Sequence, residues 1–222
     1  MQLLGQSITR NSALLALFAL FTALLIGGTW LATRDTIALE QRHAEEKALL
    51  EIVPRERHDN SMLDDTRTLR PEFTDLGLRE PRPLYIARQG GRAVAVIVPV
   101  VARDGYSGDI ELIVGVNADG TIAGVRTVKH RETPGLGDKV DLRKSQWILD
   151  FTGASLDNPK PAGWAVRKDG GNFDQFTGAT ITPRAVVAAV QRALRYVQRE
   201  RATLFGPGVP GRDSTPEEGP TA

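Results

Sequence analysis

The strongest constraint on the fold is an uncharged stretch near the N-terminus, from Asn11 to Thr33. A helix rises about 1.5 Å per residue, so this stretch would span about 34 Å and cross a bilayer core of about 30 Å. A cleavable signal peptide is the alternative, but its apolar part is usually only about 7–15 residues long. The segment Thr29–Arg34 also lacks a small-x-small cleavage site. We therefore expect an uncleaved transmembrane anchor over residues 11–33.

The charges beside this anchor indicate its orientation. Arg10 and the terminal amine precede the stretch, whereas Arg34 after it is offset by Asp35. Positively charged residues favour the cytoplasmic side of a membrane. By a margin of one charge, the pattern predicts that residues 1–10 are cytoplasmic and that the rest of the chain lies outside the cytoplasm.

The composition excludes several classes of protein. Lysine and arginine number 28 against 27 aspartate and glutamate residues, so no basic excess supports binding to a nucleic acid. The chain has no cysteine, which excludes cysteine-bound iron–sulfur clusters, thiolate zinc sites, c-type haem and disulfides. Its three histidines are isolated and no Gly-x-Ser-x-Gly motif occurs, so we expect neither a metal site nor a serine-type triad. Redox chemistry would need an organic cofactor, or a metal held by nitrogen and oxygen.

Beyond the anchor, the composition divides the chain into three parts. Residues 34–83 begin with a charged, helix-like stalk that Pro54 ends, and continue as a polar connector for which we expect no regular structure. Residues 84–205 carry the strand and helix patterns, so we expect one folded domain there. Residues 206–222 are rich in Gly, Pro, Asp, Ser and Glu, which predicts a disordered tail.

Strand patterns dominate the first half of the expected domain. Apolar runs bounded by turn residues predict strands over 92–101, 110–116 and 122–128, with a further strand over 164–166. The turn residues of 117–120 join the second strand to the third, which makes a hairpin. These patterns predict an α+β fold, with an antiparallel sheet and flanking helices.

Two helices are expected in the same domain. A short helix over 142–151 would bury Trp147 and Ile148. A long final helix follows Thr182 as N-cap, with Pro183 at the first helical position, where proline is favoured. Apolar residues then repeat at helical spacing along one face of this final helix.

The segment just before the final helix has the composition of a phosphate site. Residues 174–183 read Asp-Gln-Phe-Thr-Gly-Ala-Thr-Ile-Thr-Pro, with Thr177 and Thr180 on either side of Gly178 and Ala179. Free N–H groups and the positive end of the helix dipole favour a phosphate at such a place. The alternative is that these threonines only cap the helix, which is the commoner role of such residues.

A second glycine-rich loop lies about forty residues upstream, over 130–139. It reads His-Arg-Glu-Thr-Pro-Gly-Leu-Gly-Asp-Lys and follows a predicted strand. A Pro-Gly turn there would expose backbone N–H groups, and Leu136 could lie flat against a planar ring. Glu132 and Thr133 add a carboxylate and a hydroxyl, and Gly137 adds a second glycine. An ordinary polar loop is the alternative, because Gly-x-Gly is too short for a dinucleotide fingerprint.

Together these segments resemble a known family. The string from Asp174 to Thr182 resembles the flavinylation motif of FMN-binding domains, and residues 132–137 resemble the loop beside the isoalloxazine ring in that family. Residues 105–108 and 164–171 fit the same pattern. With the single N-terminal anchor, the chain is similar to the RnfG (RsxG) family, which belongs to the Rnf (Rsx) electron transport complex of proteobacteria.

The resemblance implies a covalent cofactor and a set of contacts. FMN would be attached by a phosphoester to Thr180, with Thr177, Gly178, Ala179 and Thr182 around the attachment point. A Mg-dependent flavin transferase would load it from FAD. Contacts to the flavin ring are expected from Glu132, Thr133, Leu136 and Gly137, and weaker polar contacts from Ser107 and Lys168.

The resemblance also implies a role in the cell. Such a protein passes electrons between ferredoxin and NAD, working with other membrane and iron–sulfur subunits. The transfer is coupled to movement of Na⁺ or H⁺ across the bacterial inner membrane. The protein would cross that membrane once, in contact with lipid, with its FMN domain on the periplasmic side and no nucleic acid as a partner.

Two alternatives stay open at the level of sequence. One is the homologous membrane-anchored flavin subunit of the Na⁺-translocating NADH:quinone reductase, which shares the flavin motif and the anchor. The other is a membrane-anchored binding module without redox activity, whose threonines are only helix caps. This second alternative predicts a colourless protein.

Overall fold

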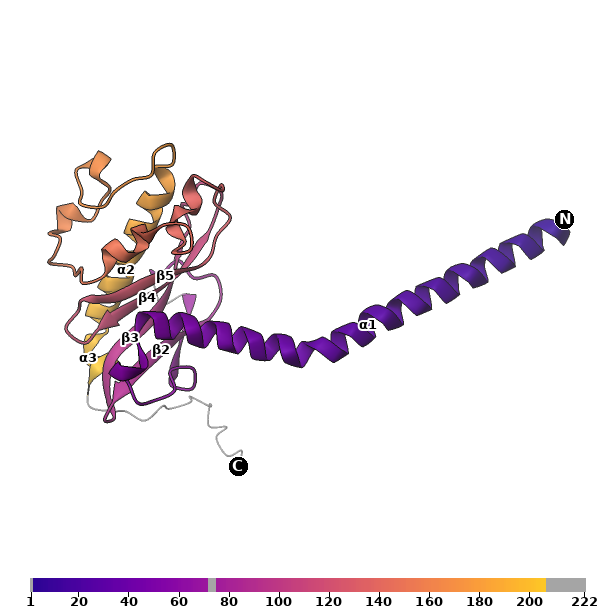
Figure 1. The fold of residues 1–222 in the computed structure, drawn as a ribbon, viewed down its shortest axis with the longest axis horizontal. Helices are drawn as coiled ribbons and strands as arrows, with labels where there is room; N and C mark the ends of the chain where they lie inside the picture. Colours follow the sequence, from indigo (N-terminus) through magenta and orange to yellow (C-terminus); the bar gives the residue numbers. More distant parts are fainter. Residues whose placement is uncertain (1, 72–74, 207–222) are drawn as a thin grey trace, which may run out of the picture. The chain divides into compact units, whose positions relative to one another are not determined.

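The computed structural model describes residues 2–71 and 75–206. The chain divides into two compact units, Met1–Glu45 and Glu46–Ala222. Apart from Gly206, the tail predicted for 206–222 lies outside the described residues. The second unit contains the sheet and the remaining helices, so every site discussed below belongs to it (Figure 1).

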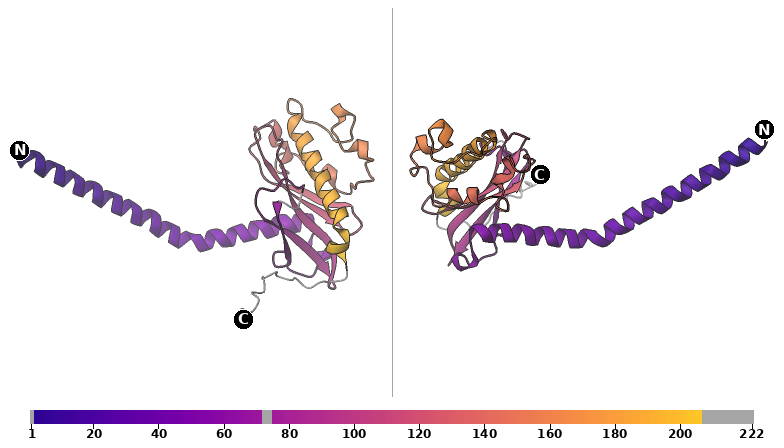
Figure 2. Two further views of the ribbon diagram at one scale, coloured as in Figure 1. Left: turned by 180° about the vertical axis from the view of Figure 1, so that it is seen from behind. Right: turned by 45° about the horizontal axis from the view of Figure 1, so that its top comes forward.

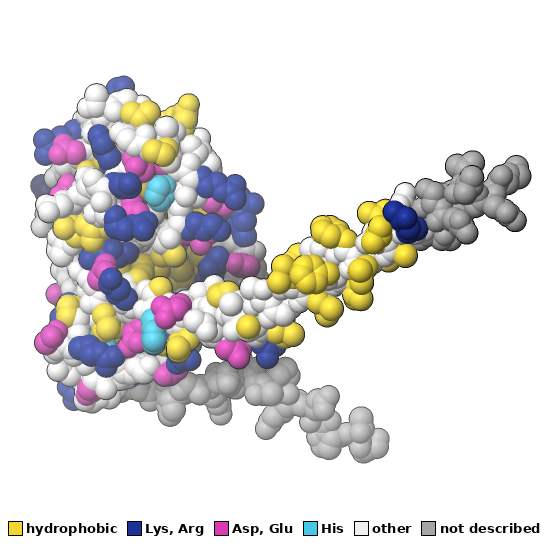
Figure 3. Space-filling view, turned by 45° about the vertical axis from the view of Figure 1, so that its right-hand side comes forward, with side chains coloured by type: hydrophobic (Ala, Val, Ile, Leu, Met, Phe, Trp, Pro, Cys, Tyr) yellow, Lys and Arg dark blue, Asp and Glu magenta, His cyan; other side chains and the backbone are white. Residues whose placement is uncertain are grey.

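The N-terminal stretch is part of one helix, α1, which runs from Gln2 to Ile52. It is long and apolar enough to cross a membrane. Its large apolar side chains between residues 14 and 31 are mostly exposed, as the hydrophobic colouring in Figure 3 shows. The predicted border between anchor and stalk therefore falls inside a continuous helix. The physical reason is that no proline interrupts the chain before Pro54.

Five antiparallel strands form a single sheet in the second unit. The strands follow one another in space as they do in sequence, which makes a simple meander. Their bounds are β1 Thr66–Leu69, β2 Arg82–Gln89, β3 Arg92–Ala102, β4 Ile110–Asn117 and β5 Ile122–Lys129. The α+β fold, the strands β3 to β5 and the β4–β5 hairpin are thereby confirmed.

Both faces of the sheet are covered. Helix α2, Ile181–Arg199, crosses one face, where the larger core lies (Figure 2). The end of α1 contributes Leu49 and Ile52 to a smaller core on the other face. Successive residues of a strand point to opposite faces, so Val96 packs in the larger core and Ile97 in the smaller one. Coverage on both sides explains why β3 reads as a continuous apolar run rather than an alternating one.

The polar connector contains more structure than its sequence predicted. Residues 55–83 include the 3₁₀ helix η1, Arg55–Arg57, the strand β1 and the start of β2. Strand β1 pairs with β2 at the sheet edge, with Thr66 opposite Tyr85. Three of its four residues are exposed, so no apolar pattern marks it. The expectation that regular structure begins at residue 84 is therefore wrong.

The segment after β5 folds into short 3₁₀ helices. These are η3 Gly137–Val140, η4 Gln146–Phe151, η5 Pro161–Gly163 and η6 Arg167–Asp169. Helix η4 buries Trp147 and Ile148 as predicted, although it starts four residues later than expected. A final short helix, α3, covers Arg201–Phe205.

The strand predicted for residues 164–166 is wrong. Within these three residues only Val166 makes a β-bridge, to Phe173, and Trp164 follows directly after η5. The apolar side chains of this segment serve an aromatic cluster instead. Phe151 and Phe173 stack with their ring centroids 4.6 Å apart, and the Trp164 ring lies 5.2 Å from Phe173. Packing between rings therefore replaced the ladder pairing that the apolar run suggested.

Candidate functional site

The threonine-rich segment forms a tight turn that ends where α2 begins. The Ala179 N–H donates to the Phe176 carbonyl at 3.0 Å, and Gly178 takes a φ of 80°, a value that favours glycine. The turn leaves Thr177 and Gly178 exposed.

The start of this segment is fixed from below by Trp147. The indole Nε1–H of Trp147 donates to the Asp174 carbonyl at 2.8 Å. The Phe176 ring lies edge-on to the same indole, with centroids 5.0 Å apart. Sequence analysis predicted that Trp147 is buried but gave no signal for this contact, which joins residues 27 positions apart.

Thr180, not Thr182, is the N-cap of α2. The Thr180 side chain is half-buried and makes no capping hydrogen bond. Thr182 lies inside the helix, is fully buried, and donates its hydroxyl to Glu132 Oε2. The predicted cap at Thr182 is therefore wrong, and Pro183 occupies the third helical position rather than the first. The physical reason is that a tertiary partner, unseen in the local pattern, takes the Thr182 hydroxyl.

The upstream loop contains the expected Pro-Gly turn. The Leu136 N–H donates to the Thr133 carbonyl at 3.1 Å, with Gly135 at a φ of 79°. Thr133 is exposed, and the Leu136 side chain is 42% exposed. An apolar side chain thus stands open to solvent at the tip of this loop.

Glu132, in contrast, points into the protein and is only 4% exposed. Its Oε1 accepts the backbone N–H of Ser107 at 2.9 Å, and its Oε2 accepts the Thr182 hydroxyl. Both carboxylate oxygens therefore already have protein partners. The side chain of Ser107 is exposed, so this residue enters the arrangement through its backbone.

Three segments that are distant in sequence meet here: 105–108, 132–137 and 177–182. A Cβ atom built on Gly105 would lie 3.0 Å from Glu132 Oε1. One built on Gly178 would lie 3.5 Å from Leu136 Cδ2. The structure thus brings together the three motifs that sequence analysis singled out separately.

Lys168 belongs to η6, which lies beside the start of α2. The Lys168 N–H donates to Gln175 Oε1 at 3.2 Å, while its side chain is exposed. Arg184 donates two hydrogen bonds of 2.5 Å to the Asp169 carboxylate. This guanidinium lowers the pKa of Asp169, so the pair is charged at neutral pH. Arg184 is thus bonded to Asp169 at the positive end of α2.

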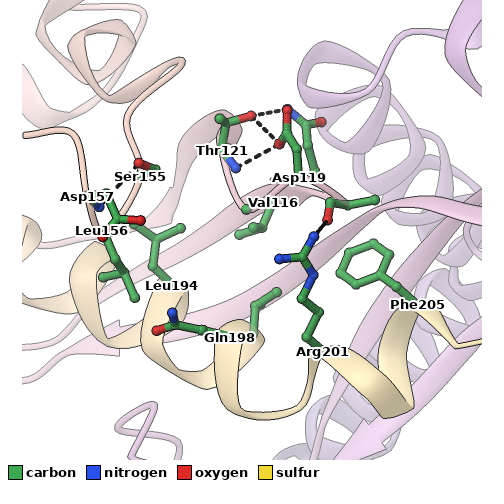
Figure 4. Close-up of a pocket in the computed structure, with 14 residues that line it drawn as sticks. Val116, Asp119, Thr121, Ser155, Leu156, Asp157, Leu194, Gln198, Arg201 and Phe205 are labelled. Carbon is green, nitrogen blue, oxygen red and sulfur yellow. Dashed lines mark hydrogen bonds between the residues drawn. The ribbon is translucent and has the colours of Figure 1, made fainter.

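A separate pocket of about 150 Å³ lies at the other end of α2 (Figure 4). The β4–β5 turn, residues 155–157, the end of α2 and the side chains of Arg201 and Phe205 line it. Its Arg201 guanidinium donates to the Ala118 carbonyl at 2.6 Å. At about 1.5 Å per helical residue, Leu194 of this pocket lies about 20 Å along α2 from Thr180. The pocket contains none of the motif residues, so we do not assign the candidate site to it.

Comparison with known proteins bears directly on these loops. Residues 105–195, which include all three, match the FMN-binding domain family. Residues 1–52 match the RnfG N-terminal region. The RnfG component of the ion-translocating oxidoreductase complex from Pseudomonas aeruginosa (strain UCBPP-PA14) is 52% identical over 203 residues, which cover 91% of this chain and 94% of the relative.

The chain belongs to the RnfG family. Two further relatives with the same name support the assignment. The protein from Shewanella loihica is 48% identical over 200 residues, covering 90% of this chain and 94% of its own. The protein from Vibrio atlanticus is 43% identical over 199 residues, with the same coverage. Of the two flavoprotein families considered from sequence, the comparisons therefore select RnfG rather than the flavin subunit of the NADH:quinone reductase.

Proposed function

We propose that this RnfG protein carries FMN through a phosphoester to Thr180 and acts as an electron carrier of an ion-translocating oxidoreductase complex. The observation that carries the proposal is the position of Thr180. Its side chain lies at the start of α2 without a capping hydrogen bond, inside the segment that matches FMN-binding domains. Residues 105–108 and 132–137 meet the same turn, so one group could contact all three segments.

The surroundings of Thr180 suit a phosphate on its hydroxyl. The first N–H groups of a helix have no partner within the helix, and the helix dipole is positive there. Ile181 and Thr182 supply the first two of these positions, while Pro183 has no N–H. Arg184 keeps a guanidinium nearby through its bonds to Asp169. A phosphate linked to Thr180 would therefore meet donors and positive charge.

The ring of FMN would lie against the exposed tips of the loops. Leu136 offers an apolar surface next to Gly178, and Thr133 is exposed on the same loop. Ser107 and Lys168 are exposed at the neighbouring segments. When bound, FMN supplies the redox chemistry, because no side chain of this protein can transfer electrons of that kind. The protein contributes attachment, orientation and the contacts that set the reduction potential.

Loading of the site would be a single group transfer by a Mg-dependent flavin transferase. The Thr180 Oγ attacks the phosphorus of the FMN half of FAD and forms the new P–O bond. The phosphoanhydride bond breaks, AMP leaves, and the hydroxyl proton passes to a base of the transferase or to water. Thr180 is thus an attachment point that is used once and not a nucleophile in turnover.

The family name of the relatives gives the context of the assembly. We infer that the protein works with the other membrane and iron–sulfur subunits of such a complex, which links electron transfer between ferredoxin and NAD to transport of Na⁺ or H⁺. Helix α1 would cross the inner membrane in contact with lipid. The charges of Arg10, Arg34 and Asp35 favour a periplasmic FMN domain.

Attachment can be tested with the full chain co-produced with a flavin transferase and run on a denaturing gel. The wild-type band should show flavin fluorescence, and Thr180→Ala should remove it. Thr177→Ala is the matched control, since it removes an exposed hydroxyl from the same turn and should leave the band. Fluorescence that persists in Thr180→Ala would overturn the assignment.

A further inference from the structure

The buried carboxylate of Glu132 lies among the motif loops, where an uncompensated charge would be costly. It is 96% buried by area, which follows from its 4% exposure. Burial of a charged group is tolerated when hydrogen bonds satisfy it. The Ser107 N–H and the Thr182 hydroxyl provide these bonds, one to each oxygen. Glu132 therefore joins three chain segments through one side chain.

Glycine makes this close approach possible. A Cβ atom on Gly137 would lie 2.6 Å from Glu132 Oε2 and 2.8 Å from Thr182 Oγ1. Gly137 has no positive φ, so its backbone does not itself require glycine. The requirement for glycine at this position thus comes from the space that the Glu132–Thr182 pair occupies.

We propose that Glu132 and Thr182 form a latch that positions Thr180 for flavin attachment. Thr180 already has helical backbone angles, with φ −80° and ψ −27°. Consecutive helical residues are about 100° apart around the axis, so residues two positions apart project to nearly opposite sides. When the latch holds Thr182 toward the interior, Thr180 is turned outward. This inference rests on the proposed function, in which Thr180 receives the phosphate of FMN.

The latch changes the role expected for two residues. Glu132 becomes a positioning residue that acts through Thr182, rather than a contact to the flavin ring. Thr182 uses its hydroxyl inside the protein and is not a phosphate ligand. The latch needs a hydroxyl at position 182, so serine should serve and valine, which has nearly the same shape, should not.

The test is a time course of flavin attachment to the detergent-solubilised full chain, using flavin transferase, FAD and Mg²⁺. Thr182→Val should slow the initial rate at least tenfold, and Thr182→Ser should stay within about threefold of wild type. Glu132→Gln should also slow attachment, because its amide replaces one acceptor. The double variant should be no slower than Thr182→Val alone, since both changes break the same interaction.

A control separates positioning from general stability. Val190→Ala removes buried volume from α2 in the larger core, away from the latch, and should lower Tm while leaving the rate within about twofold. Equal rates for wild type and Thr182→Val, or an equal loss in Val190→Ala, would overturn the latch. If wild type itself takes up no flavin, the proposed function fails instead, so the two failures are distinguishable.

Discussion

Two glycines allow close contacts in different parts of the domain, and the contacts differ in kind. Gly115 of β4 makes room for the end of α1, because a Cβ atom there would overlap with Ile52 Cγ2. Gly137 makes room for Glu132 and Thr182. The first contact is apolar and belongs to the smaller core, whereas the second is polar. Packing thus places the end of α1 on the sheet, while hydrogen bonds place the candidate flavin site.

The largest effect is expected at the apolar contact. Gly115→Val should lower the free energy of unfolding by about 3 kcal/mol, because the added side chain overpacks against Ile52. Chemical denaturation of the purified chain measures the loss. Ile52→Ala in the same chain should restore part of it by making room. A double variant that is less stable than Gly115→Val alone would contradict the packing explanation.

The polar contact should respond differently. Gly137→Ala should cost about 2 kcal/mol by disturbing the bonds of a buried carboxylate, and should also reduce flavin attachment. In-gel fluorescence and denaturation together measure both effects. Gly120→Ala is the control, because Gly120 has a φ of 93° and open space around it, in the β4–β5 turn. It should cost stability and leave attachment unchanged, and a loss of attachment there would show that stability alone governs loading.

A pair of tryptophans tests how local the site is. Trp147→Phe should cost about 1 kcal/mol, since it removes the bond to the Asp174 carbonyl, and should slow flavin attachment. Trp164→Phe removes a similar bond, to the Ser155 carbonyl at 3.1 Å, outside the attachment segment. Its stability loss should be similar, with the attachment rate close to wild type. Equal slowing by both variants would argue against a specific role for Trp147.

The smallest effect is expected from an ion pair in the loop after η3. Arg143 donates hydrogen bonds to Asp141 and lowers the pKa of that carboxyl in the folded protein. The stabilisation is therefore complete above the pKa of an unfolded aspartate and is lost as pH falls through the lowered pKa. Asp141→Asn should reduce Tm slightly at neutral pH and flatten the acid limb of a plot of Tm against pH. An unchanged acid limb would remove Asp141 from the account.

The sequence predicted those parts of the fold whose signal is local. Strand β3 has an uninterrupted apolar run, and the β4–β5 turn has the residues that such turns favour. Strand β1 was missed because an exposed edge strand needs no apolar pattern. The cap at Thr182 was predicted wrongly because its partner, Glu132, lies fifty residues away. The motifs were thus visible in sequence, but the hydrogen bonds that join them depend on tertiary structure.

The central claim is that one threonine carries the flavin. The most direct measurement is the intact mass of the full chain produced with a flavin transferase, followed by peptide mapping. The account predicts a mass above that of the polypeptide by FMN less one water, located on Thr180, and an unmodified mass for Thr180→Ala. An unmodified wild-type chain, or the same added mass on Thr180→Ala, would contradict it.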